Sequence, residues 1–208
     1  IGLGTSLAYL GEGKLMFYQT GSVGAGHPAR WFSSDYGQTW GEPVAIARTS
    51  DEKPWHIWDP PLVDRHPRTG KVTQLAETGY AQSGTSSQAY IRFSTDEGLT
   101  WSKPIKVPQW QGVNEVALFR AGNGDLLAAC RTDVPRRLTG KTLDHYEGLG
   151  ISISKDDGRT WSAVKKLYDY GRHHPSLLLM PNQDIVMTYV VRLGYVDDQN
   201  GFPQFGIE

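Results

Sequence analysis

A glutamate and an arginine frame the stretch of the chain whose residue types are best suited to chemistry. In "NEVALFRAGNGDLLAACR", Glu115 opens one apolar segment and Arg131 closes the next, with a turn rich in Gly and Asn between them. A hairpin brings its two ends together, so we expect the carboxylate and the guanidinium to meet. Such a carboxylate stays ionised, and a guanidinium can hold a substrate carboxylate with two hydrogen bonds. Residues of these types can hold an acidic group, or they can form a buried clasp between two strands.

Other acidic, basic and imidazole side chains lie near the ends of further apolar segments. Asp59 together with Glu115 could supply the two carboxylates that hydrolyse a glycosidic bond, one as the acid and the other as base or nucleophile. The candidates for catalysis are Glu115, Asp59 and His174, and those for substrate binding are Arg131, His56, Glu77, His173, Arg192 and Tyr189.

The pair of histidines in "RHHP" supports an alternative chemistry. Tyr189 with His173 or His174 could remove a proton next to a uronate carboxylate that Arg131 neutralises, which is the chemistry of a lyase. Adjacent side chains in a strand point to opposite faces. We therefore expect at most one of the two histidines to face a common site, which also argues against a metal site built from both.

One eight-residue motif recurs three times, about sixty residues apart. The copies are "SSDYGQTW" at 33–40, "STDEGLTW" at 94–101 and "SKDDGRTW" at 154–161. In a tight hairpin the Asp carboxylate accepts backbone N–H groups, the Gly adopts a positive φ and the Trp packs between neighbouring sheets. Asp35, Asp96 and Asp156 are therefore expected to be structural and not catalytic.

Each repeat contains the parts of a four-stranded propeller blade. An inner strand ("SLAYL", "PPLVD", "EVALFR", "PSLLLM") leads through a turn to a second strand, a third strand runs into the motif, and a short fourth strand follows the Trp. The sequence predicts one all-β domain of about three and a half blades, at about 1–50, 51–108, 109–168 and 169–208, with no amphipathic helix. Since a closed propeller needs roughly four to eight blades, we expect either a longer chain that supplies the remainder or self-association that closes the ring.

This strand order also predicts which end of the blades carries a site. Inner strands begin where second strands finish, so the candidates above gather over the mouth of the central channel and the recurring aspartates lie at the opposite end. The same face should hold further polar and aromatic residues from strand ends and loops: His27, Trp58, Tyr80, Asn114, Arg136, Arg137, Asp144, His145, Tyr146, Glu147, Tyr195 and Asp197. Such a gathering on one face favours a functional site.

The repeated motif resembles the Asp boxes, or bacterial neuraminidase repeats, of the sialidase-like six-bladed β-propellers, over essentially the whole chain. The resemblance implies that fold and a carbohydrate-active enzyme, an exo-sialidase-like glycoside hydrolase of sialic or other acidic sugars. In sialidases a Glu that opens an inner strand helps to ionise a tyrosine nucleophile, and an Arg that closes the return strand is the second of three that grip the substrate carboxylate. By this resemblance Glu115 is the base or charge partner and Arg131 is the anion clamp.

Three positions depart from the sialidase pattern. The segment "GLGTSLAYL" lacks the first arginine, His27 occupies the place of the general-acid Asp, and no arginine precedes the third Asp box, although Arg172 or Arg192 could replace it. The nucleophilic Tyr would lie beyond Glu208. These departures keep open a propeller that binds glycans without catalysis, with stacking platforms drawn from Trp55, Trp58, Trp110 and Tyr146.

Composition narrows the classes of partner. The formal charge of -1 argues against a nucleic-acid surface, and no apolar run approaches the roughly 20 residues of a membrane span. Cys130 is the only cysteine, so it can form neither an intramolecular disulfide nor a thiolate zinc cluster, and we expect a buried thiol. The predicted partner is a glycan or a small acidic sugar, without a cofactor or metal. A divalent ion held by one histidine with Asp59 and Glu77 is a less favoured alternative.

Overall fold

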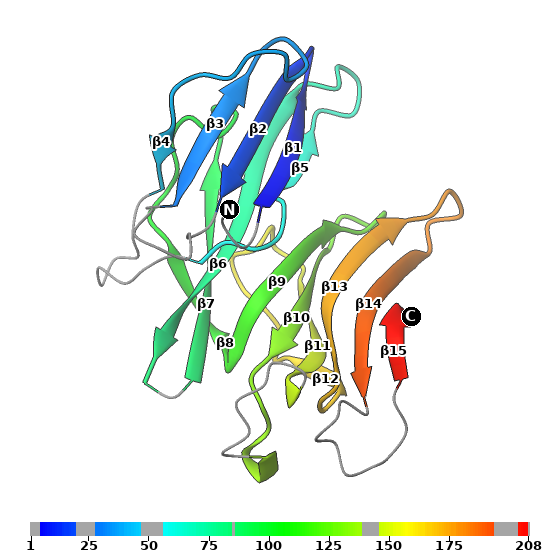
Figure 1. Ribbon diagram of the computed structural model, residues 1–208. Helices are drawn as coiled ribbons and strands as arrows, with labels where there is room; N and C mark the ends of the chain where they lie inside the picture. The colour runs from blue at the N-terminus through cyan, green and yellow to red at the C-terminus, as the bar shows by residue number, and fades with distance from the viewer. Residues whose placement is uncertain are drawn as a thin grey trace. The chain divides into compact units, whose positions relative to one another are not determined.

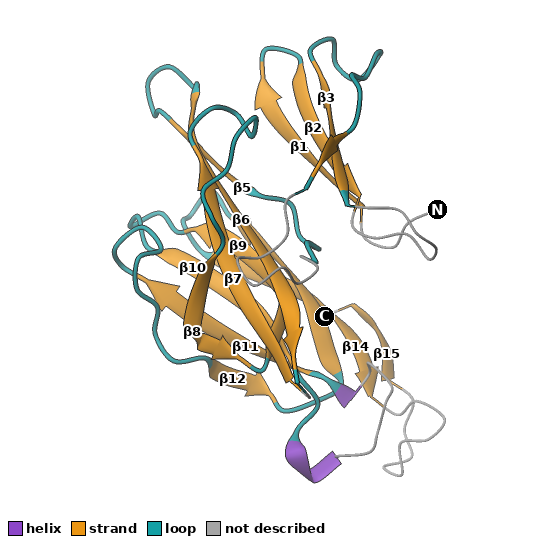
Figure 2. Cartoon of the chain, turned by 90° about the vertical axis from the view of Figure 1, so that its left-hand side faces the viewer, coloured by secondary structure: helices purple, strands orange, loops and turns teal. Residues whose placement is uncertain are grey.

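The structure is a computed structural model that describes residues 5–19, 28–46, 56–84, 86–138, 146–193 and 204–207. These residues lie almost entirely in strands and loops, and the short helical segments include the 3-10 turn η1 (Arg136–Leu138) (Figure 2). In this part of the chain no helix has the length and apolar character needed to cross a membrane.

The strands form four antiparallel sheets, and within each sheet the strands lie side by side in chain order (Figure 1). The first sheet contains β1 (Thr5–Gly11), β2 (Lys14–Gln19), β3 (Ala29–Ser33) and β4 (Val44–Ala45). The second contains β5 (Leu62–Arg65), β6 (Val72–Ser83), β7 (Ser86–Ser94) and β8 (Ile105–Gln111). The third contains β9 (Val113–Arg120), β10 (Leu126–Thr132), β11 (Gly148–Ser154) and β12 (Lys165–Tyr168), and the fourth β13 (Arg172–Leu179), β14 (Ile185–Leu193) and β15 (Gln204–Ile207). A meander of four antiparallel strands is the architecture of a propeller blade.

The chain divides into two compact units, and each has its own buried core. Unit 1 comprises residues 1–81 and 90–106, and unit 2 comprises 82–89 and 107–208. In unit 1 the largest fully buried side chains include Tyr18 and Ile57. In unit 2 the middle strand β10 buries consecutive small and apolar residues, among them Cys130, whose thiol is buried as expected. β10 has a strand on each edge and packs against β13, which explains why its burial does not alternate as in a half-exposed strand.

The three Asp boxes share one hydrogen-bond pattern. In the first box, the Thr39 backbone N–H and hydroxyl donate to the Asp35 carboxylate at 2.9 and 2.5 Å, and Ser33 donates to it at 2.7 Å. The same contacts recur around Asp96 and Asp156. The two residues after each Asp, such as Tyr36 and Gly37, both have positive φ, as a type I′ hairpin turn requires. The motif is thus a self-contained turn.

Candidate functional site

The register of the third sheet separates the Asp box from the predicted site. Thr132 of β10 pairs with Gly148 of β11, whereas Leu126 pairs with Ser154, which leads directly into the third Asp box. Arg131 therefore lies at one end of this sheet and Asp156 follows the other end. The sequence-based strand order predicts this arrangement, and for the third sheet it is confirmed.

A β-bulge brings Glu115 and Arg131 together. The register between β9 and β10 shifts between Cys130 and Thr132, opposite Asn114 and Glu115. Bulges re-aim side chains, and here the bulge directs both side chains into one buried cluster. Arg131 Nη1 lies 2.7 Å from Glu115 Oε1, and the two residues are only 7% and 5% exposed.

Two more side chains complete what we call the Arg131 cluster: Glu115, Arg131, Glu147 and His174. Arg131 Nε forms an ion pair with Glu147 Oε2, and His174 Nδ1 lies 2.8 Å from Glu115 Oε2. His174 Nε2 lies 3.3 Å from Arg131 Nη1. A guanidinium can only donate, so His174 Nε2 accepts the hydrogen bond from Arg131. The proton of the neutral ring is then on Nδ1, which donates to Glu115. The guanidinium is thus shared between two carboxylates.

The two carboxyl groups in this cluster have opposite electrostatic environments. Burial alone would raise the pKa of Glu115, but the hydrogen bond from His174 and the charge of Arg131 outweigh it and hold that pKa below its ordinary value. Burial raises the pKa of Glu147 to about 7 despite the attraction of Arg131, and the nearby Glu115 carboxylate raises it further. Glu115 is thus held in its ionised form, whereas Glu147 keeps its proton to a higher pH than an ordinary glutamate does.

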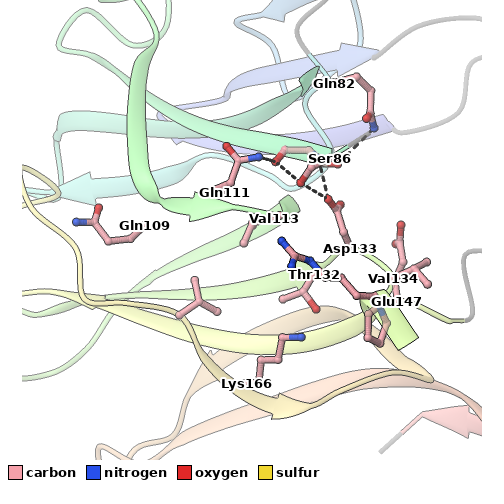
Figure 3. A pocket seen from close by; sticks show the side chains of 15 residues that line it. Gln82, Ser86, Gln109, Gln111, Val113, Thr132, Asp133, Val134, Glu147 and Lys166 are labelled. Carbon is pink, nitrogen blue, oxygen red and sulfur yellow. Dashed lines mark hydrogen bonds between the residues drawn. The ribbon is translucent and has the colours of Figure 1, made fainter. Parts of the chain in front are cut away.

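A cavity of about 820 Å³ in unit 2 reaches this cluster, because Glu147 is one of its lining residues. The remaining lining comes from the end of β6, the start of β7, the β8–β9 corner, the segment from the end of β10 to η1, and the region of β12: Gln82, Ser86, Ser87, Gln109, Gln111, Gly112, Val113, Thr132, Asp133, Val134, Pro135, Arg136, Val164 and Lys166. Figure 3 shows Asp133 directed toward Ser86 at one wall. The volume of this cavity is within the range of pockets that bind small molecules.

The remaining candidates in unit 2 take varied positions. His173 is fully buried with its ring 4.4 Å from that of His174, and His174 contacts Glu115 and Arg131. The Tyr189 hydroxyl lies 2.8 Å from the Tyr168 hydroxyl. Arg192, in β14, donates its backbone N–H to the Gly171 carbonyl. Binding of substrate by these residues stays a prediction.

The other three candidates belong to unit 1. His56 is exposed, and its ring lies 5.2 Å from that of Tyr80. The Asp59 backbone carbonyl accepts a hydrogen bond from the Tyr18 hydroxyl. Glu77 is completely buried, and its carboxylate pairs with Arg30 and Arg92. Their roles toward a substrate stay predictions.

The carboxylate of Glu77 has a clear structural partner set. Arg30 and Arg92 are 4% and 2% exposed, and their guanidinium groups lie 4.4 and 5.0 Å from the ring of Trp101 in the second Asp box. The Glu77 carboxylate thus forms ion pairs with two arginines that also contact an aromatic ring, which argues against its use as a metal ligand. Among the described residues, no group of three or more His, Cys, Asp and Glu could hold a metal ion.

Two of the expected aromatic platforms are not available to a ligand. Trp110 is fully buried against Trp161, with ring centroids 4.6 Å apart, and Tyr146 is only 3% exposed. The expectation that these two rings stack on sugars is wrong, because each fills a space in the protein core. Trp58 is half-buried, and Trp55 lies outside the described residues. His27, Asp144, His145, Tyr195 and Asp197 also lie outside them.

Sequence reasoning placed Glu147 at the same end of the blades as Glu115 and Arg131 but gave it no role. Glu147 precedes β11 in a loop with little periodicity, and its partner Arg131 lies 16 residues earlier. The signal available was its position one residue before a third strand, at the same end as Glu115. Only the ion pair and the burial reveal its altered acidity.

Four-stranded meanders, Asp-box turns and a polar cluster at the opposite end of a sheet define a β-propeller of the sialidase-like class. The chain belongs to the family of the BNR repeat-like domain, whose model matches residues 29–192. The predicted all-β propeller fold, here about three and a half blades, is confirmed by this match and by solved structures of the same fold.

Solved structures with this fold include carbohydrate-active enzymes. The chain is 18% identical to the GH93 α-L-arabinofuranosidase of Fusarium graminearum, with a TM-score of 0.67, over 99% of this chain and 60% of that one. It is 16% identical to an endo-1,4-β-xylanase from Bacteroides thetaiotaomicron, with a TM-score of 0.58, over 98% and 66%. A polysaccharide lyase, a PL25 ulvan lyase, is 11% identical with a TM-score of 0.54, over 90% and 51%.

The chain spans 60% of the length of the arabinofuranosidase and 66% of that of the xylanase. No curated protein sequence matches it.

Proposed function

We propose that this chain is part of a glycoside hydrolase in which Glu147 is the general acid and Glu115 is the second carboxylate. One observation carries the proposal: two carboxyl groups share the Arg131 guanidinium, and their surroundings move their pKa values in opposite directions. Pairs of acids whose pKa values are driven apart mark the acid and base assignments of an active site. The fold of the arabinofuranosidase and the xylanase supports the same class of reaction.

The reaction would use the proton that Glu147 retains near neutral pH. Glu147 donates this proton to the glycosidic oxygen, so that the leaving sugar departs as a neutral alcohol. Glu115, held ionised, either removes a proton from the water that attacks the anomeric carbon or attacks that carbon itself. His174 and Arg131 stabilise the Glu115 carboxylate from two sides and fix its orientation.

Sialic and other acidic sugars, the substrates implied by the sequence resemblance, need a cation for their carboxylate. Arg131 is the cation assigned to that role. Its guanidinium already contacts Glu115 and Glu147, so an acidic sugar has to displace a carboxylate or bind another cation. Uncharged glycosides meet no such cost. The Arg131 cluster therefore supports glycoside hydrolysis more directly than sialic-acid specificity.

A substrate panel with three variants tests this function. The panel contains arabinan, xylan, sialosides and uronic-acid glycans, and the product is measured as reducing sugar. We expect turnover of at least one substrate, and a loss of about 10²- to 10⁴-fold in Glu147→Gln and in Glu115→Gln. Glu42→Gln, at an exposed position remote from the cluster in sequence, should keep full activity. Absence of turnover on every substrate, or full activity in either cluster variant, would refute the proposal.

A further inference from the structure

One wall of the cavity beside Glu147 is held in place by a network around Asp133. Asp133 Oδ2 accepts hydrogen bonds from the Ser86 hydroxyl and the Ser87 backbone N–H, both at 2.8 Å (Figure 3). The Asp133 N–H donates to the Gly112 carbonyl at 2.9 Å, and the Gly112 N–H donates to Ser87 O at 2.8 Å. Three segments distant in sequence are thus tied together, so this side of the cavity is formed before any ligand arrives.

The same network reaches the Arg131 cluster. Asn114 Nδ2 lies 3.4 Å from Asp133 Oδ1, and Asn114 Oδ1 accepts the backbone N–H of Glu115 at 2.7 Å. The cavity wall and the start of the strand that carries Glu115 are therefore one hydrogen-bonded structure. A ligand held against this wall has a fixed relation to the two carboxyl groups.

The chemistry of the lining favours an uncharged ligand with many hydroxyl groups. Gln82, Gln109 and Gln111 line the cavity with exposed side chains, and an amide both donates and accepts hydrogen bonds as sugar hydroxyls do. The Gln111 amide also donates to the Ser87 carbonyl at 3.4 Å and the Gln82 amide to the Ser87 hydroxyl at 3.3 Å, so a sugar meets amides that the protein already orients (Figure 3). Two acids, Asp133 and Glu147, are matched by two cations in the lining, Arg136 and Lys166.

At least three of these four charges are already engaged within the protein, since Glu147 forms its ion pair with Arg131. Lys166 Nζ lies 3.2 Å from Asp169, and Asp133 accepts the three hydrogen bonds described above. A balanced set of charges with internal partners attracts neither anionic nor cationic sugars, whereas the amides remain suited to neutral ones.

We propose that this cavity binds an uncharged oligosaccharide segment next to the bond that is cleaved, through the Gln109 and Gln111 amides of β8. The inference rests on the proposed function in one respect: the glycan is placed next to the cleaved bond because Glu147, the proposed general acid, lines the cavity and also belongs to the Arg131 cluster. Binding itself requires no turnover. The site is thus a specificity element that selects neutral over acidic chains.

Calorimetric titration of a catalytically silent background tests the site directly. Glu115→Gln is that background, because Glu115 is outside the cavity lining and its loss keeps the probes intact. The probes are xylotriose, α-1,5-arabinotriose and, as the charged comparison, trigalacturonate. We expect at least one uncharged probe to bind, and the added pair Gln109→Ala and Gln111→Ala to weaken it about tenfold, as the loss of two hydrogen bonds predicts. Trigalacturonate should bind no more tightly.

The matched control is Gln38→Ala, which removes an exposed amide at the first Asp box in unit 1. It should leave the affinity unchanged, and thermal unfolding should confirm that all variants fold, since the three glutamines are exposed. Failure of both uncharged probes to bind, unchanged affinity in the double variant, or tighter binding of trigalacturonate would overturn the inference. If an uncharged probe binds but no substrate is hydrolysed, the proposed function alone is refuted. If hydrolysis requires Glu115 and Glu147 but no uncharged probe binds, the cavity assignment alone is refuted.

Discussion

His174 Nδ1 lies 2.8 Å from Glu115 Oε2, although the two residues are 59 positions apart (174 − 115) and belong to different sheets. His174 reaches this position with a left-handed backbone, φ 52°, where the register of β13 shifts between His173 and Ser176. A regular strand would not give it this conformation. The irregularity thus supplies a hydrogen bond to a carboxylate that burial would otherwise drive toward the neutral form.

Removal of this hydrogen bond should change the pH profile of the reaction. Glu115 must be ionised, so activity falls as the pH drops through its pKa. In His174→Ala, burial is opposed by Arg131 alone, so the pKa of Glu115 rises and the acid limb of kcat/KM should move to higher pH. His66→Ala, at the exposed side of unit 1 between β5 and β6, is the matched control and should not move it. An acid limb that stays in place in His174→Ala would contradict this role.

Glu147 should make stability depend on pH in the opposite sense to most acids. Its folded-state pKa of about 7 exceeds the ordinary value of 4.5. Between these two pH values the folded protein therefore binds more protons than the unfolded chain does. Stability from this group is therefore present below about pH 4.5 and is lost as the pH rises to about 7. The loss is at most about 3 kcal/mol.

Urea unfolding at pH 5 and at pH 8 gives the fall in the free energy of unfolding between the two pH values. This fall is compared between the unmodified protein and two variants. Glu147→Gln should show a smaller fall in stability between the two pH values, whereas Glu42→Gln should match the unmodified protein. An identical fall in all three proteins would show that Glu147 titrates normally.

The buried Glu77 should matter far more for stability than an exposed glutamate in an ion pair. Glu77→Gln leaves Arg30 and Arg92 buried without a countercharge, which costs about 3–5 kcal/mol. Glu97→Gln removes a pair with Lys14 whose side chains are both more than a third exposed, so water screens it and its loss should cost clearly less. Urea unfolding compares the two variants, and equal losses would rule out the buried clasp.

The tryptophans of the Asp boxes should differ in their contribution despite their identical motif positions. Trp161 is 6% exposed and packs against Trp110, whereas Trp40 is 40% exposed. Trp161→Ala should therefore cost about 3–5 kcal/mol and Trp40→Ala clearly less. Chemical unfolding of the two variants gives the ranking, and a larger loss in Trp40→Ala would reverse it.

Sequence reasoning correctly paired Glu115 with Arg131, because both lie at the ends of one hairpin and their approach depends only on local geometry. It assigned no role to Glu147, because no hairpin pattern in the sequence fixes how its side chain meets that of Arg131. It expected platforms from Trp110 and Tyr146, because residue type does not reveal that a ring is used to fill a core. Glu77 was assigned to substrate, and its burial between two arginines follows from packing between strands distant in sequence.

By itself, the sequence determined the all-β blades, the three Asp-box turns and the end of the sheet at which polar residues gather. These features follow from alternation, glycine positions and short-range hydrogen bonds, which act within about ten neighbouring residues. Only the tertiary structure decided that Arg131 is shared by Glu115 and Glu147 and that His174 holds Glu115 ionised. Charge interactions in a buried cluster depend on distance and desolvation, and both arise from the packing of segments that are far apart in the chain.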